Sequence, residues 1–172
     1  MRLAFHQGRK MIRPATARDV RAIAEIVRPY AHQRILISKD LIDYFEHLQE
    51  FVVVEVDGEV VACGALHVFW EDIAEIRTLA VKEDYLGRGL GRAIVAELEA
   101  RAAALGIRRL FCLTFEVDFF ARAGFHPIEG TPVGVDVYQE ILRSHDDGTA
   151  EFLDLARVKP NTLGNYRMLK EL

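Results

Sequence analysis

The pattern of apolar and polar residues along the chain predicts alternating helices and strands. Apolar residues recur every three to four positions after Thr16 and again after Ser38, which indicates two helices capped by these hydroxyls. Pro29 is expected to end or kink the first of them. Further helices are predicted over 90–105, 116–123 and 135–144.

Strand-like segments are recognised by their β-branched and aromatic residues. Residues 51–56 and 59–70 flank Asp57-Gly58, a dipeptide typical of a hairpin turn. The other predicted strands are 11–15, 73–81, 108–115 and 152–158, and 160–172 is predicted to be loop and short helix. This order of elements predicts an α/β protein with a mixed central sheet flanked by helices.

The size and charge of the chain suit one globular domain. Its 172 residues are enough for a single core, and we expect a domain with a C-terminal extension over 11–172 after a flexible leader at 1–10. A net charge of -4 argues against a nucleic-acid partner bound through bulk charge. The sequence has no apolar run of membrane-spanning or signal-peptide type, so a cytoplasmic protein without a membrane partner is expected.

The cysteines and histidines do not indicate a metal site. Cys63 and Cys112 lie in apolar strand-like runs and are predicted to be buried, reduced thiols rather than a disulfide or a metal pair. The six histidines have no ligand spacing with them, so no metal is predicted.

A glycine-rich segment between a predicted strand and a predicted helix has the layout of an anion site. Residues 85–93 read Tyr-Leu-Gly-Arg-Gly-Leu-Gly-Arg-Ala. Glycines let several backbone N–H groups converge, and the helix N-terminus adds positive potential, so a pyrophosphate is the expected guest. The Rossmann spacing fails because Arg92 and Ile94 occupy the sixth position, and Gly91 lacks the Lys-Ser or Lys-Thr of a P-loop.

Three segments in this order resemble the acetyl-CoA-binding core of the GNAT acetyltransferases: 74–81, 85–93 and 119–125. Gly89 and Gly91 match the family signature, whereas Leu86 departs from its leading Arg or Gln. The resemblance implies a single-domain GNAT fold with acetyl-CoA as co-substrate. It also implies cofactor contacts at Leu79, Ala80, Val81, Leu86, Gly87, Arg88, Gly89, Leu90, Gly91, Arg92 and Phe120.

A narrower resemblance extends beyond this core. The segments 63–67, 113–116, 128–132 and especially 158–165 (Val-Lys-Pro-Asn-Thr-Leu-Gly-Asn) are similar to the short, stand-alone N-acetylglutamate synthases of actinobacterial type. Those enzymes transfer acetyl from acetyl-CoA to the α-amine of glutamate, the first committed step of arginine biosynthesis. The resemblance implies glutamate as substrate, arginine as a candidate feedback effector and a homodimer.

Acetyl transfer to an amine needs a base that takes a proton from the ammonium group. Strand alternation is expected to place Glu75, Arg77, Leu79 and Val81 on one face, and by resemblance Glu75 is the candidate base. An ordinary ion pair between Glu75 and Arg77 is an equal alternative. His67 is the rival base, because imidazole titrates near neutral pH, although a packed histidine is the commoner case.

A substrate with two carboxylates calls for cations. Arg77 is the first candidate, followed by Lys39, for which a solvated helix end is the alternative, and by Lys159 and Asn161 in the C-terminal string. Turn chemistry around Pro160 is the alternative for Asn161.

Protonation of the leaving thiolate has no obvious donor. Many GNAT members carry a Tyr where this chain has Phe120, which can pack against the cofactor but has no proton to give. Water or Thr114 could serve, or the thiolate could leave unprotonated, since a thiol pKa is about 8.5.

Two other functions stay open at this level. The chain could acetylate another amine, such as glutamine, another amino acid, a polyamine or a peptide. It could also be a non-catalytic acyl-CoA sensor, which the absence of Tyr at Phe120 would suit.

Overall fold

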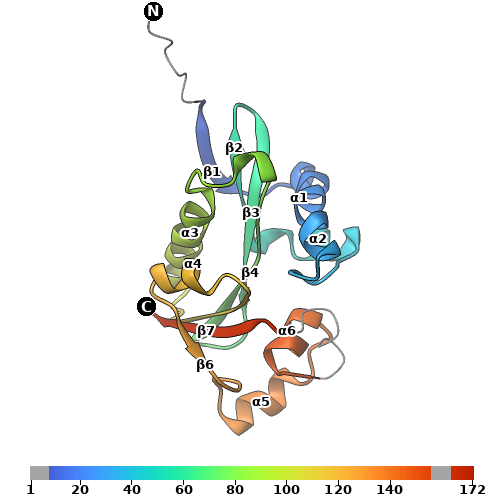
Figure 1. Ribbon diagram of the computed structural model, residues 1–172. Helices are drawn as coiled ribbons and strands as arrows, with labels where there is room; N and C mark the ends of the chain where they lie inside the picture. Colours follow the sequence, from blue (N-terminus) through green and yellow to red (C-terminus); the bar gives the residue numbers. More distant parts are fainter. Residues whose placement is uncertain (1–7, 156–163) are drawn as a thin grey trace, which may run out of the picture.

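The structure is a computed structural model that describes residues 8–155 and 164–172 (Figure 1). Within these residues, seven strands form one sheet in the order β1-β2-β3-β4-β5-β7-β6. Neighbouring strands are antiparallel except β4 and β5, which are parallel. The strands are β1 (Lys10–Pro14), β2 (Phe51–Val56), β3 (Glu59–Val68), β4 (Ile73–Val81), β5 (Arg109–Thr114), β6 (His126–Ile128) and β7 (Tyr166–Glu171).

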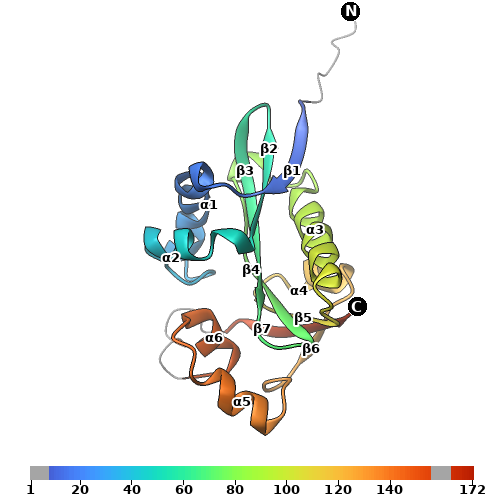
Figure 2. The same ribbon diagram turned by 180° about the vertical axis from the view of Figure 1, so that it is seen from behind.

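Helices cover both faces of the sheet (Figures 1 and 2). Apolar side chains of α3 and α4 pack on one face, and those of α1 and α2 pack on the other. A third cluster joins α5 and α6 to the latter face at the other end of the sheet. The helices are α1 (Val20–His32), α2 (Leu41–Glu46), α3 (Leu90–Ala104), α4 (Val117–Arg122), α5 (Val135–Ile141) and α6 (Asp147–Phe152).

The expected α/β architecture with a mixed sheet is confirmed, with two corrections at the N-terminal half. Helix α1 continues through Pro29 to His32. Helix α2 begins at Leu41, and Asp40, not Ser38, is its N-cap; the Asp40 N–H donates to the Asp43 carboxylate at 2.9 Å. Both cysteines are free and buried as expected, and burial raises the pKa of Cys63 to about 12.

The C-terminal part departs further from expectation. The predicted strand over 152–158 is wrong at its described residues: Phe152 ends α6, and 153–155 are turn and loop. Residues 156–158 lie outside the described part. Strand β7 occupies Tyr166–Glu171, where loop and short helix were predicted, and lies between β5 and β6. None of the helices in the described residues has the length and apolar character needed to cross a membrane.

Strands β4 and β5 part soon after they begin. Among the described residues they pair at three positions, Ile73 with Arg109, Ala74 with Leu110 and Glu75 with Phe111. Beyond Glu75 the edge of β4 that faces β5 therefore has main-chain groups without a strand partner. This split creates the space in which the candidate site lies.

A bulge in β4 changes which side chains face the split. Thr78 has a positive φ of 56°, which is unusual for a β-branched residue, and the pairing with β3 shifts between Cys63 and Ala65. Beyond the bulge, Leu79 and Val81 join the cluster under α3, on the opposite face from Glu75 and Arg77. The expectation that all four share one face is therefore wrong after Thr78.

Candidate active site

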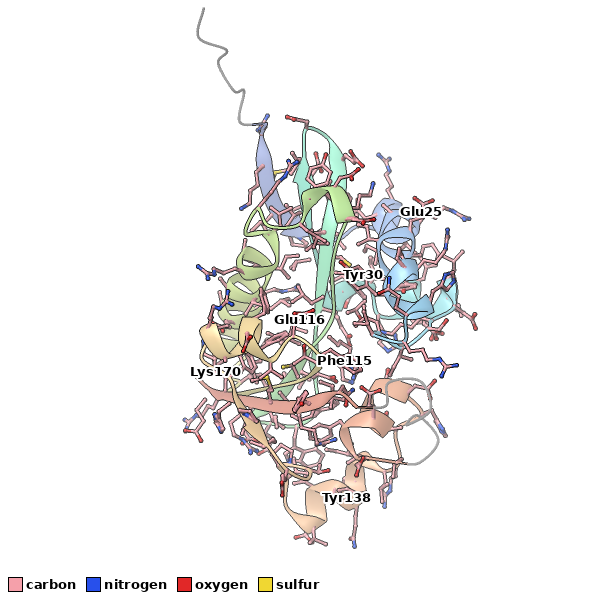
Figure 3. All side chains as sticks on the ribbon, in the orientation of Figure 1. Glu25, Tyr30, Phe115, Glu116, Tyr138 and Lys170 are labelled. Atoms are coloured by element: carbon pink, nitrogen blue, oxygen red, sulfur yellow. The ribbon has the colours of Figure 1, made fainter. Side chains whose placement is uncertain are left out.

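A cleft of about 760 Å³ lies where β4 and β5 part. Its walls come from β4, the glycine loop, the N-terminus of α3, the end of β5, α4, α6 and the connector between α1 and α2. Figure 3 labels three residues that line this cleft, Tyr30 on α1 and Phe115 and Glu116 in the loop after β5. The Tyr30 hydroxyl donates to the Val81 carbonyl at 2.7 Å, which ties α1 to the end of β4.

The glycine loop shapes one end of the cleft for an anion. Gly87 and Gly89 have positive φ angles of 74° and 76°, and Gly89 is the N-cap of α3. Gly89, Leu90, Gly91 and Arg92 line the cleft at this helix start. Unpaired N–H groups of the first helical turn and the helix dipole favour a pyrophosphate here.

Arg88 is placed differently from its neighbours in the loop. Its guanidinium lies 4.7 Å from the centre of the Tyr85 ring and donates to the Asp84 carbonyl at 3.1 Å. It is not among the described residues that line the cleft. The other predicted cofactor residues, Leu79, Ala80, Val81, Leu86, Gly87, Gly89, Leu90, Gly91, Arg92 and Phe120, all line it.

A buried chain of charges lies at the other end of the cleft. Glu75 Oε2 accepts from Arg77 Nε at 3.2 Å and from Nη2 at 3.0 Å. Arg77 Nη1 donates to Asp146 Oδ1 at 2.9 Å, so two carboxylates hold this guanidinium. Both partners of the first pair are almost fully buried, Glu75 at 4% and Arg77 at 8% exposed.

Burial raises the pKa of Glu75, although the positive charge of Arg77 opposes the shift. A carboxyl group with a raised pKa takes up a proton more readily than an ordinary glutamate, and Glu75 also lines the cleft. These two properties are what acid–base chemistry at this position requires.

Lys39 faces the cleft and has no carboxylate partner at hydrogen-bond distance among the described residues. Its Nζ donates to Thr78 Oγ1 at 3.4 Å and lies 5.9 Å from the centre of the Tyr44 ring. Burial lowers the pKa of Lys39, with the positive charge of Arg77 acting in the same direction. An anionic group in the cleft would relieve this desolvated charge.

His67 lies on β3 opposite Glu75 but is not among the described residues that line the cleft. Its Nδ1 lies 2.7 Å from Glu50 Oε1, and its Nε2 lies 3.5 Å from the Thr149 hydroxyl. The ring therefore links β3 to the residue before β2 and to α6, which does not support its expected part as a base.

The match to a known family decides the assignment of this chain. The model of the acetyltransferase (GNAT) family matches residues 18–125, well over half of the chain. The chain belongs to the GNAT acetyltransferases. The match includes the glycine loop, β4 and α4, so the predicted family and its co-substrate class agree with the geometry.

Close relatives narrow the assignment within GNAT. The chain is 52% identical over 164 residues to the amino-acid acetyltransferase of Mycobacterium tuberculosis, covering 94% of each protein. It superimposes with a TM-score of 0.91 on the crystal structure of Rv2747 from that organism in complex with CoA and NLQ, at 52% identity and covering 94% of this chain and 99% of that one. The expectations of an α/β GNAT fold and of an acetyl-CoA-dependent amino-acid N-acetyltransferase are confirmed.

A longer GNAT relative shares the fold over nearly the whole chain. The N-acetylglutamate synthase of Neisseria gonorrhoeae complexed with coenzyme A and N-acetyl-glutamate gives a TM-score of 0.76 at 26% identity, covering 95% of this chain and 35% of that one. The same synthase complexed with coenzyme A and L-arginine gives 0.70 at 25% identity, covering 95% and 33%.

Most of the C-terminal string 158–165 lies outside the described residues. Lys159 and Asn161 lie outside the described residues. Asn165 donates to Glu151 Oε1 at 3.2 Å.

Several residues that sequence patterns did not single out also line the cleft. They are Tyr30, Thr78, Gly148 and Glu151. Gly148 and Glu151 come from α6, whose first five residues were assigned to no element, so the pattern gave no signal for them.

Proposed function

We propose that this chain is an N-acetylglutamate synthase that transfers acetyl from acetyl-CoA to the α-amine of L-glutamate. The observation that carries the proposal is the cleft itself, which has an anion-binding helix start at one end and Glu75 and Lys39 at the other. The close similarity to an amino-acid acetyltransferase supports an amino acid as the acceptor.

The donor fits between the parted strands. The pyrophosphate of CoA binds at the N-terminus of α3, around Gly89 and Gly91. The pantetheine arm runs along the free edge of β4 at Leu79–Val81, where main-chain groups can bond its amides and polarise the thioester carbonyl. Val81 lies six positions after Glu75, about 20 Å of strand at ~3.3 Å per residue, which suits an extended donor.

Glu75 is the base that accepts the proton. The carboxylate takes a proton from the substrate ammonium, directly or through one water, and the neutral amine attacks the thioester carbon. The nitrogen of the tetrahedral intermediate still carries an extra proton. When the C–S bond breaks, this proton passes from nitrogen to the leaving CoA thiolate, directly or through water, to give the amide and the CoA thiol, whose pKa is about 8.5. Thr114 lines the cleft and its Oγ1 accepts from the Glu116 N–H at 2.8 Å, and as a hydroxyl it can relay this proton to the sulfur.

The acceptor carboxylate pairs with Lys39 rather than with Arg77. Lys39 faces the cleft with a hydroxyl as its hydrogen-bond partner, whereas Arg77 already donates to Glu75 and Asp146. This order reverses the sequence-based expectation, in which Arg77 came first. Lys159 and Asn161 stay candidates for a second carboxylate contact.

Release of free CoA thiol from acetyl-CoA tests the proposal across a panel of amines. We expect turnover with glutamate, weaker turnover with glutamine, which shares the α-amino-acid core, and little with a polyamine or a peptide. Brisk turnover with a polyamine or a peptide, and none with either amino acid, would contradict the proposed acceptor. Tight binding of acetyl-CoA without transfer to any amine would instead indicate a sensor.

We further propose a cytoplasmic homodimer that arginine inhibits. Leu41, Ile42 and Phe45 of α2 are exposed, which supports a protein contact on this helix. The relative complexed with L-arginine supports an effector role for that amino acid. Light scattering at several concentrations measures the mass, and initial rates with added arginine measure the inhibition.

A further inference from the structure

The short helix α6 is held against β4 by an unusual fit between a guanidinium and a glycine. The Arg77 guanidinium lies so close to Gly148 that a Cβ there would be 2.7 Å from Cζ and from Nη2 and 2.9 Å from Nη1. Contacts this short are not found for real Cβ atoms, so only a glycine lets the guanidinium lie there.

The same guanidinium is bonded to the residue that caps α6. Arg77 Nη1 donates to Asp146 Oδ1 at 2.9 Å, and that oxygen also accepts from the Thr149 N–H at 2.7 Å. The positive charge of Arg77 and the bond from Thr149 hold the pKa of Asp146 well below its usual range, against the effect of burial. Asp146 therefore stays charged at neutral pH and keeps this bond.

Two further contacts converge on the start of α6. His47 Nε2 lies 3.7 Å from Asp146 Oδ2, and His67 Nε2 lies 3.5 Å from the Thr149 hydroxyl. Three elements of the core, the end of α2, β3 and β4, thus meet the first turn of this helix.

Helix α6 contributes part of the wall at the Glu75 end of the cleft. Gly148 and Glu151 both line the cleft there, together with Lys39. The residues matched by the GNAT family model stop at 125, so this wall belongs to the part of the chain outside that match. A wall outside the common core is a reasonable place for acceptor selectivity.

We infer that Arg77, Asp146 and Gly148 form a clamp that positions α6, and that this clamp selects an α-amino-acid acceptor by closing the cleft opposite Lys39. The inference rests on the proposed function, because it concerns the acceptor end of the same cleft. In this arrangement Arg77 is a positioning residue that acts through α6 and does not grip the substrate. Loss of the clamp weakens acceptor binding and leaves the donor site intact.

Two substitutions separate the clamp from other effects. Asp146→Ser keeps an N-cap hydroxyl for α6 but is too short to reach Arg77. Gly148→Ala should raise the melting temperature if helix propensity alone mattered, whereas the added methyl displaces Arg77 if the clamp matters. Gly134→Ala is the matched control, because a Cβ at Gly134 meets no atom within 4 Å. Arg77 itself is left unchanged, since its removal would also free Glu75.

The first measurement is steady-state kinetics. It is made at one fixed pH, because histidines can change their charge near neutral pH and both His47 and His67 face α6. For both variants we expect the glutamate KM to rise about tenfold or more, as the loss of a charge-assisted hydrogen bond implies. The acetyl-CoA KM and kcat should stay within about twofold of the wild type, and Gly134→Ala should change nothing.

The second readout is amide hydrogen exchange with CoA bound, which also shows that each variant is folded. Amides of α6 should exchange faster in Asp146→Ser and Gly148→Ala than in the wild type. Faster exchange without a change in glutamate KM would overturn the selective role, and unchanged exchange would overturn the clamp. A wild-type protein inert toward glutamate would overturn the proposed function and the selective role together, while the exchange data would still decide whether the clamp holds α6.

Discussion

At the scale of single residues, the burial of Glu75 makes a prediction about pH. A base must be ionised to work, and burial raises the pKa of this carboxyl, so kcat/KM should fall as pH drops through a value above the ordinary glutamate pKa of about 4.3. Glu75→Gln should lower kcat by a factor of about 10² or more and remove this acid limb. pH–rate profiles of the wild type and of Glu75→Gln measure this acid limb.

His67→Gln distinguishes the rival base. Because His67 is bonded to Glu50 and not among the described cleft residues, its replacement should leave the acid limb in place. Loss of the limb in His67→Gln, with the limb retained in Glu75→Gln, would transfer the role of base to the imidazole.

Lys39→Met tests the cation at the acceptor end. Methionine keeps much of the length but not the charge, so the glutamate KM should rise by a factor of roughly 10–100, the equivalent of ~1.5–3 kcal/mol for a hydrogen bond to a charged group. The acetyl-CoA KM should hardly change. Lys82→Met is the control, because Lys82 pairs with Glu59 at the surface and is not among the described cleft residues. Equal rises in both KM values would mark Lys39 as structural.

At the scale of elements, the start of α3 depends on a left-handed glycine. Gly89 has a φ of 76°, and an L-residue in this conformation costs about 1–2 kcal/mol. Gly89→Ala should therefore lower the melting temperature and raise the acetyl-CoA KM, because strain at this N-cap moves the N–H groups that face the pyrophosphate.

Gly106→Ala controls for the strain alone. Gly106 follows α3 with a φ of 81°, and a Cβ there meets no atom within 4 Å, as is also true at Gly89. This variant should lose comparable stability without a change in acetyl-CoA KM. A similar KM change in both variants would mean that the glycine loop acts only through stability.

The elements that sequence predicted well are those with a regular pattern and clear punctuation. The hairpin at Asp57-Gly58 and the strand Ile73–Val81 were both predicted at their observed positions. Strand β7 was missed because Tyr166–Glu171 alternates poorly and carries charged residues on both sides of its two buried positions. Its place between β5 and β6 depends on pairing with distant segments, which local pattern does not encode.

The candidate site was predictable to a similar extent. The donor end follows a local motif, and its glycines line the cleft as expected. The acceptor end does not, because the bulge at Thr78 turns Leu79 away from Arg77, and Asp146 lies 69 positions from the guanidinium that it bonds. Alternation within one strand could indicate neither of these relations.

At the scale of the whole molecule, a charged cluster joins the first strand to the fold. Arg13 bonds Asp19 at 2.7 Å and Glu55 at 2.9 Å, which ties β1, β2 and the start of α1 together. The hydrogen bond from Arg13 lowers the pKa of Asp19 to about 2. Because the pKa of Asp19 is lower in the folded than in the unfolded protein, the ion pair stabilises the fold fully at pH values above the unfolded pKa of about 3.9. This stabilisation is lost as the pH falls toward the folded pKa of about 2.

Asp19→Asn should lower the free energy of unfolding by roughly 1.5–3 kcal/mol near neutral pH, and the difference from the wild type should shrink in acid. Urea denaturation at several pH values measures both effects. Glu140→Gln is the control, since its pair with Arg143 is exposed and should contribute less than about 1 kcal/mol. A difference that persists unchanged in acid would show that packing, not charge, is responsible.

The short contact between β4 and β5 has a consequence for how the molecule holds together. In the described part of the chain, one half of the sheet, β1 to β4, meets the other, β5 to β7, through three residue pairs of β4 and β5 and through the helices that bridge them. A donor whose amides bond the free edge of β4 takes the place of a missing strand and joins the two halves. The protein would thus be a complete sheet only with its substrate in place, so substrate supply would set its lifetime in the cell as well as its rate.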